Sequence, residues 1–252
     1  MIKTIIITVL ICCNTLVLAY KIIPIGTHCS AAAAIKGLNL RQVSLPLDWI
    51  VSSFAGLYQA FNDDFAHFLE KSSLRIRGDQ QGIVDYYGFQ FVHDFPTTTQ
   101  TIKPSIDGSQ EDVAVLVSQG KISPHYMDFY DEITSKYARR IKRMYEFCNG
   151  DEQVFFIRHF GMNKQQAIAF RDLIENKFPS LDFILVVVSP VRSQENDWNL
   201  PKIRNFYLDD RQVWNNPTEW ERIYKALGLS VQNATRSITR LAERCLLCKV
   251  IE

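Results

Sequence analysis

Cys29 stands where a thiol could act as a nucleophile in this chain of 252 residues. It follows the run 21–25 and Gly26, and it precedes the alanine-rich segment 30–36. The run is apolar and rich in β-branched residues, which favours a buried strand, and the alanine-rich segment favours a helix ended by Gly37. A thiol between a strand end and a helix start lies near outward-pointing N–H groups and the positive end of the helix dipole, which lower its pKa. The pattern predicts a thiolate nucleophile, and the alternative is a small buried cysteine that packs the strand on the helix.

His93 and Asp48 carry groups that could activate such a thiol. His93 lies in an alternation of apolar and polar residues over 89–95, which predicts a strand with the histidine at its end. Asp48 follows Pro46 in a segment that cannot be helical, so it either orients a base or caps a helix expected from Trp49 onward. A thiol, an imidazole that removes its proton and a carboxylate that orients the imidazole together make a thiol hydrolase.

Other candidates rank lower on geometric grounds. Asp94 neighbours His93 along a strand, where successive side chains point to opposite faces, so it is the second choice for the orienting carboxylate. His28 adjoins Cys29 in sequence, which seldom gives good geometry, and it ranks below His93 as the base. The remaining histidines are expected to be structural: His67, His125 and His159. The last of these is of interest because it follows a predicted strand.

The composition narrows the class of protein. The chain holds 28 basic and 27 acidic residues, a net charge of +1, which gives no reason to expect a nucleic acid partner. Its hydrophobic content of 47%, with 16 Phe and 10 Tyr, is enough for a large core in one domain. There is no G-x-G-x-x-G or P-loop sequence, and no cofactor is expected.

The first 19 residues are expected to form a signal peptide. Residues 4–18 are an apolar run behind the single charge of Lys3, with a cleavage site predicted after Ala19. The alternative is an uncleaved anchor, since about 17 residues is the lower limit for a spanning helix. Cleavage is preferred because the first strand starts almost at once, and it places the protein outside the cytoplasm. No later run is long and apolar enough to span a membrane.

The cysteines suggest no metal site. Six cysteines become four if Cys12 and Cys13 leave with the signal peptide, and an oxidising compartment then allows disulfides. Cys245 and Cys248 form a C-x-x-C, but zinc would need two more ligands. Both lie on the apolar stripe of an amphipathic helix expected over 229–252, so they are interpreted as packing, partner-facing or disulfide-linked residues, with a redox-active pair as the least favoured alternative.

The elements that must position Cys29 indicate an α/β fold. A strand, a helix and a continuously apolar strand in succession are typical of a parallel βαβ unit buried on both faces. The expected elements of the second half are a helix over 126–148, strands over 154–158, 183–188 and 203–208, and helices over 164–178 and 216–227. Residues 71–81 and 97–119 are expected to be loops. We therefore expect a single domain over 20–228 with a mainly parallel sheet flanked by helices, the alternative being a papain-like α+β arrangement.

Several sequence blocks resemble a known family. Residues 24–29 and 44–49, the block 91–95 and the later segments 137–141 and 154–158 are similar to the corresponding blocks of the papain-like cysteine peptidases of one uncharacterised family. The resemblance covers most of residues 21–227, and Leu47 stands where the family usually has phenylalanine.

The resemblance implies a cysteine peptidase that acts on a peptide or another acyl compound. It implies Cys29 as nucleophile, with its backbone N–H as a donor to the oxyanion, His93 as base and Asp48 as the orienting carboxylate. The residues expected to line the binding site are Gly26, His28, Trp49 and Asp94.

Two further functions stay open at this point. The first is a non-catalytic or glycan-related surface protein of the same fold, in which Cys29 is buried or disulfide-bonded. The second is a transferase that binds an anionic donor at the turn 26–29, because a helix N-terminus favours anions. The distances between Cys29, His93 and Asp48 bear on the choice.

Overall fold

A four-stranded parallel sheet carries the turn that leads to Cys29. The computed structural model describes residues 20–98, 121–192, 198–208 and 217–229. The strands of this sheet, in their hydrogen-bonded order, are β1 (Tyr20–Pro24), β6 (Gln153–His159), β7 (Phe183–Ser189) and β8 (Ile203–Tyr207). All three pairings are parallel. The central strands β6 and β7 are buried along nearly their whole length, as continuous apolar runs predict.

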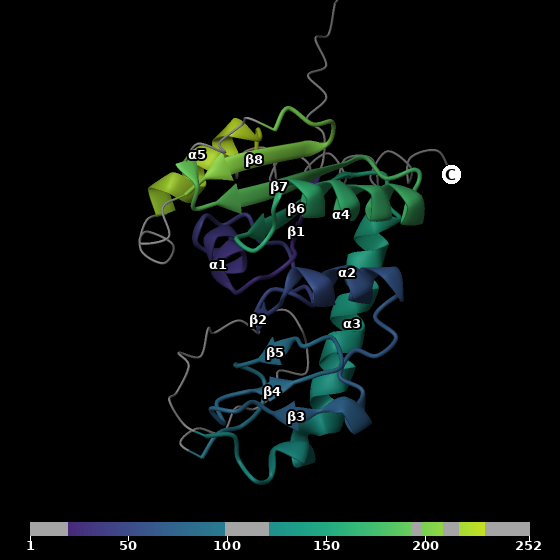
Figure 1. The fold of residues 1–252 in the computed structure, drawn as a ribbon, viewed down its shortest axis with the longest axis vertical. Helices are drawn as coiled ribbons and strands as arrows, with labels where there is room; N and C mark the ends of the chain where they lie inside the picture. The colour runs from purple at the N-terminus through teal and green to yellow at the C-terminus, as the bar shows by residue number, and fades with distance from the viewer. Residues whose placement is uncertain (1–19, 99–120, 193–197, 209–216, 230–252) are drawn as a thin grey trace, which may run out of the picture.

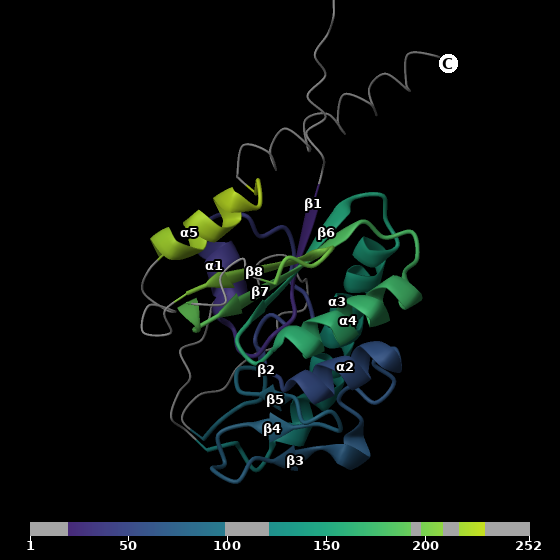
Figure 2. The same cartoon turned by 45° about the horizontal axis from the view of Figure 1, so that its top comes forward.

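Helices cover both faces of this sheet (Figures 1 and 2). One face packs against α1 (Ser30–Gly37) and α5 (Pro217–Ala226). The other packs against α2 (Phe54–Asn62), α3 (Tyr130–Cys148) and α4 (Lys164–Lys177). Successive residues of a strand alternate between the two cores, because side chains of a strand point to opposite faces. The expected mixed α/β fold with a parallel sheet flanked by helices is therefore confirmed.

A second, antiparallel sheet lies beyond α2, in the lower part of Figure 1. Its four strands have two residues each, and their order is β2 (Ile50–Val51), β5 (Gln90–Phe91), β4 (Ile83–Val84) and β3 (Arg75–Ile76). Helix α3 runs past both sheets. A bridge between Thr27 and Val51 joins the strand β2 to the turn after β1.

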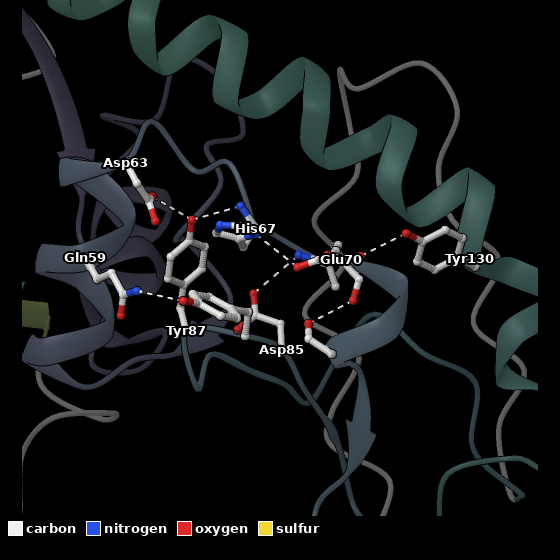
Figure 3. Close-up of polar contacts among 10 residues, drawn as sticks. Gln59, Asp63, His67, Glu70, Asp85, Tyr87 and Tyr130 are labelled. Atoms are coloured by element: carbon white, nitrogen blue, oxygen red, sulfur yellow. Dashed lines mark hydrogen bonds and ion pairs between the residues drawn. The ribbon is translucent and has the colours of Figure 1, made fainter.

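Polar contacts tie the β4–β5 turn of the second sheet to the segment after α2 (Figure 3). The hydroxyl of Tyr87 donates to Asp63 Oδ1 at 2.6 Å and accepts from the His67 N–H at 3.0 Å. The fully buried Asp85 accepts from the N–H groups of Leu69 and Phe89, at 3.4 and 2.9 Å. Hydrogen bonds therefore add to the apolar contacts that hold these short strands.

Three expectations about local structure were wrong. Ser53, not Asp48, caps α2: its side chain accepts from Gly56 N at 3.1 Å, and Trp49 precedes a strand instead of entering a helix. Residues 71–81 contain a 3-10 helix (Lys71–Ser73) and β3. The strand expected over 89–95 is only β5, because the chain bends after Phe91.

The helix expected over 126–148 is confirmed as α3 preceded by a 3-10 helix (Tyr126–Phe129), and Cys148 lies on its buried side. The signal peptide, most of the loop 97–119 and the C-terminal helix fall on residues 1–19, 99–120 and 230–252, which lie outside the described residues. The proposed domain limits therefore stay predictions. Across the described residues, no helix has the length and apolarity needed to cross a membrane.

Candidate active site

Cys29 lies at the carboxyl end of β1 and is the N-cap residue of α1. Its carbonyl oxygen accepts the first helical hydrogen bond, from Ala33 N at 2.8 Å. The Cys29 side chain makes no capping hydrogen bond, so the N–H groups of the first turn lack the partner that an N-cap side chain usually supplies. Ligands of open parallel sheets bind at the carboxyl ends of the strands, which is where this thiol stands.

Burial changes the expected chemistry of the thiol. Cys29 is partly buried, and this desolvation raises the pKa of its thiol, while its own backbone N–H acts in the opposite direction to a smaller extent. The prediction of a lowered pKa at this position was therefore wrong, because desolvation of the thiolate outweighs the effect of the backbone N–H. A neutral thiol needs a base to become a nucleophile.

Gly26 gives the turn before Cys29 a shape that other residues cannot adopt easily. Its φ is +51°, and a Cβ at this position would lie 2.9 Å from Ser52 Oγ and 3.4 Å from the Leu47 carbonyl oxygen. Gly26 therefore allows β1 and the segment around β2 to approach each other closely, in the sharp turn that the sequence predicts.

Arg158, on β6, is hydrogen-bonded to the backbone of the same turn. Its side chain is fully buried, and its guanidinium donates to the carbonyl oxygens of Ile25 and Gly26 at 2.7 and 2.6 Å. It also donates to the carbonyl oxygen and the hydroxyl of Ser52, at 3.0 and 3.2 Å. Burial lowers its pKa to about 10, so it stays charged at neutral pH. Sequence reasoning missed this residue, although an arginine at the end of a continuously apolar strand was a usable signal.

Two histidines flank Cys29. The rings of His28 and His159 are 5.3 Å apart and nearly perpendicular, and His28 also contacts Phe160. Burial and then the charge of Arg158 lower the pKa of His28. Burial and then His28 lower the pKa of His159 to about 3. Both effects favour neutral imidazoles at this end of the sheet.

His159 makes a short hydrogen bond to Ser30. Its Nδ1 and the Ser30 hydroxyl are 2.6 Å apart. The pair has the geometry of a nucleophile and its base, but each residue is only 1% exposed. A substrate cannot reach it there, so the bond joins β6 to the first turn of α1.

His93 and Asp48 lie in a second cluster, around Trp49. The rings of His93 and Trp49 are 6.4 Å apart and perpendicular, and the guanidinium of Arg41 lies 5.3 Å from the Trp49 ring. Arg41 Nη2 pairs with Asp48 Oδ2 at 2.5 Å, and the same oxygen accepts from Leu45 N at 2.9 Å. Asp48 therefore reaches the His93 ring through two intervening side chains.

Asp94 anchors the chain after His93 to α3. It accepts from Lys136 Nζ at 2.7 Å and from the Tyr137 hydroxyl at 2.8 Å, and all three side chains are buried. Burial alone would raise the pKa of Asp94, but the charges of Lys136 and Arg140 and these hydrogen bonds bring it below its ordinary value. Lys136 and Tyr137 belong to α3, which fits the low rank of Asp94 as an orienting group for His93.

Comparison with known families identifies the chain. The model of a family described as "Putative papain-like cysteine peptidase (DUF1796)" matches residues 20–192. The chain belongs to this family. The match includes both clusters described above and ends before β8.

A viral protein is similar to this member of the papain-like peptidase family. It is "Uncharacterized protein R408" of Acanthamoeba polyphaga mimivirus, 25% identical over 234 residues, which cover 79% of this chain and 92% of that protein. No solved structure matches the chain.

In this family member, the structure brings only some of the expected residues together. Cys29 lies with Gly26 and His28, while Asp48, Trp49 and His93 form the other cluster, and the bridge between Thr27 and Val51 links the two segments. Among the described residues, no imidazole is hydrogen-bonded to the Cys29 thiol. The pairing of Cys29 with His93 therefore stays a prediction.

The cysteines and the possible metal ligands complete the description of the site. Cys29 and Cys148 are free thiols. Within the ranges that the structure describes, no three His, Cys, Asp or Glu side chains group as a metal site would require. Cys245 and Cys248 lie outside these ranges.

Proposed function

We propose that the protein is a thiol hydrolase that cleaves a peptide or another acyl bond, with Cys29 as the nucleophile. The observation that carries the proposal is the position of this free, partly exposed thiol, at the carboxyl end of β1 and on an uncapped helix N-terminus. Membership of a papain-like cysteine peptidase family supports a peptidase at the level of the family.

The reaction starts from a neutral thiol and a neutral imidazole. The imidazole takes the proton as Sγ of Cys29 bonds to the acyl carbon, and the oxyanion that forms accepts from the backbone N–H of Cys29. The bond to the leaving group then breaks, and the imidazolium returns the proton to that group. Water, deprotonated by the same imidazole, hydrolyses the thioester and releases the acid and the thiol.

His93 is our proposed base, and His28 is the alternative. The chain of contacts from Asp48 through Arg41 and Trp49 holds the His93 ring in a defined orientation, which supports a catalytic role. The neighbouring position of His28 and its lowered pKa support the alternative. His159 is a weaker base than either role needs, because its pKa is about 3. Gly26, Trp49 and Asp94 are proposed to shape the binding site.

The test is the rate at which iodoacetamide alkylates Cys29 between pH 5 and pH 9. Peptide mapping by mass spectrometry separates Cys29 from the other cysteines, and burial raises the pKa of Cys148 to about 12, which keeps that thiol unreactive. We expect His93→Ala to slow the alkylation at pH 7 by at least tenfold, as loss of a general base does. His125→Ala is the matched control, because that histidine is exposed on the surface.

Hydrolysis is measured in parallel with a mixture of fluorogenic peptides and with p-nitrophenyl acetate. We expect Cys29→Ser to abolish it. A larger effect of His28→Ala than of His93→Ala would make His28 the base. A Cys29 that reacts no faster than free cysteine, in a protein that hydrolyses none of these probes, would overturn the hydrolase in favour of the non-catalytic binding protein.

A further inference from the structure

The last residues of β6 contact the turn around Cys29 from both faces of the sheet. Arg158 and His159 are consecutive residues of this strand, so their side chains point to opposite faces. Arg158 reaches the residues before Cys29, and His159 reaches the residue after it. The candidate nucleophile thus stands between two anchors from one neighbouring strand.

On one face, the anchor is a buried charge. Arg158 is fully buried, and its four hydrogen bonds go to two carbonyl oxygens of the turn and to two oxygens of Ser52. No carboxylate of the described residues pairs with it. An unpaired buried charge is costly, since it loses its hydration, and hydrogen bonds to carbonyl dipoles repay only part of that loss. A role in fixing the turn that precedes the candidate catalytic thiol would account for a charge buried at such a cost.

On the other face, the anchor is neutral. His159 Nδ1 is 2.6 Å from the hydroxyl of Ser30, the first residue of α1. Next along the chain, the Phe160 carbonyl oxygen accepts from the Thr27 hydroxyl at 2.9 Å. The last two residues of β6 and the residue that follows the strand therefore fix the chain from Ile25 to Ser30.

We propose that Arg158 and His159 are positioning residues for Cys29: they fix the turn on both sides of the thiol. That these residues serve catalysis rests on the proposed hydrolase function. The titratable groups around the turn are His28, Cys29 and His159, and the pKa shifts of both histidines favour their neutral forms. The charge of Arg158 contributes to the lowered pKa of His28, whereas burial is the main influence on the Cys29 thiol.

The test titrates the Cys29 thiol directly in the full-length chain, by the NMR shift of cysteine labelled with carbon-13 at Cβ. Cys29→Ser assigns the signal. The variants are Arg158→Lys, which keeps the charge but not the planar fork of donors, and Arg158→Gln, which loses both. We expect the thiol pKa of both variants to differ from that of the wild type by about half a unit or more, because neither variant keeps the fork of donors that holds the carbonyl oxygens of Ile25 and Gly26.

Arg143→Gln is the matched control. Arg143 also donates to a backbone carbonyl oxygen, that of Ser44 at 2.9 Å, but outside the turn, so we expect the thiol titration to stay as in the wild type. Titrations of both Arg158 variants that coincide with that of the wild type would overturn the positioning by Arg158, because the thiol would then be insensitive to the fork that holds its turn.

If Arg158→Gln does not fold, Ser30→Ala tests the proposal on the other face of the sheet. This substitution removes only the hydroxyl that is hydrogen-bonded to His159. We expect amide hydrogen exchange to rise at least fivefold over residues 25–31 and to stay unchanged in α4. Unchanged exchange at the turn, or a uniform rise over the whole chain, would overturn the positioning. A wild-type protein that hydrolyses nothing while the variants behave as expected would overturn the hydrolase and leave the positioning intact.

Discussion

Gly26 illustrates at the scale of one residue how closely two segments pack beside the candidate nucleophile. Its positive φ suits a residue without Cβ, and Ser52 and Leu47 fill the space that a Cβ would take. Gly37, at the end of α1, has no atom within 4 Å of the corresponding Cβ position. Gly26 and Gly37 lie near the two ends of α1, but only Gly26 occupies a position where a side chain would not fit.

Gly26→Ala should destabilise the protein by about 2–4 kcal/mol, because the left-handed backbone costs about 1–2 kcal/mol and the contact with Ser52 adds to it. Urea unfolding measures the change. Gly37→Ala is the control and should be neutral or raise the free energy of unfolding by up to about 1 kcal/mol. Equal effects of both substitutions would contradict the packing described around the turn.

Asp85 predicts a pH dependence of stability. Burial raises its pKa to about 7, against the hydrogen bonds that it accepts, from an ordinary value of 3.8. The folded chain then binds more protons than the unfolded chain between about pH 4 and 7, so this residue makes the free energy of unfolding fall as the pH rises through that range.

Asp85→Asn should remove this fall, which is measured as urea midpoints between pH 4.5 and 8. Asp79→Asn is the control: Asp79 is exposed and pairs with Arg77, its pKa is lowered to about 2, and so its effect belongs below pH 4. A fall with pH that persists in Asp85→Asn would assign it to another group.

At the scale of elements, the buried cluster of Asp94, Lys136 and Tyr137 joins the segment after β5 to α3. Asp94→Asn should cost about 3–5 kcal/mol, because it leaves the Lys136 charge buried without its carboxylate. Glu146→Gln breaks an exposed pair with Lys142 and should change the free energy of unfolding by less than about 0.5 kcal/mol. Denaturant unfolding of both variants is the measurement, and similar losses would refute the difference in burial.

The elements also show which features the sequence could predict. The βαβ unit of β6, α4 and β7 was predictable, because its long apolar strands and helical periodicity are strong signals. The two-residue strands β2, β3 and β4 were not, since pairing and polar contacts with distant segments define them, and β5 was predicted only as part of a longer strand. Cys29 could be identified because the strand, turn and helix around it form a local sequence pattern. The role of Arg158 could not, because it depends on carbonyl groups 132 and 133 residues away along the chain.

At the scale of the whole molecule, β1 starts at the first residue after the proposed cleavage site. Tyr20 is buried, and its carbonyl oxygen accepts from Gln42 at 3.3 Å. A signal peptidase that cuts after Ala19 would leave a chain that enters the sheet at once. We propose that this cleavage takes place, and we expect the mass of the mature protein to place its N-terminus at Tyr20, whereas a mature protein that retains residues 1–19 would favour the membrane anchor.

The pairing of β1 with β6 also determines when the site can form. Tyr20 pairs with Gln153, so the strand that precedes Cys29 finds its partner only 133 positions further along the chain. Closing such a long loop is slow compared with forming local helices, and chains emerge from the ribosome with their N-terminal part first. The Cys29 turn therefore stays unassembled during synthesis until β6 has emerged. An incomplete chain carries the cysteine but not the anchors that shape its surroundings, which ties any activity of this thiol to completed folding.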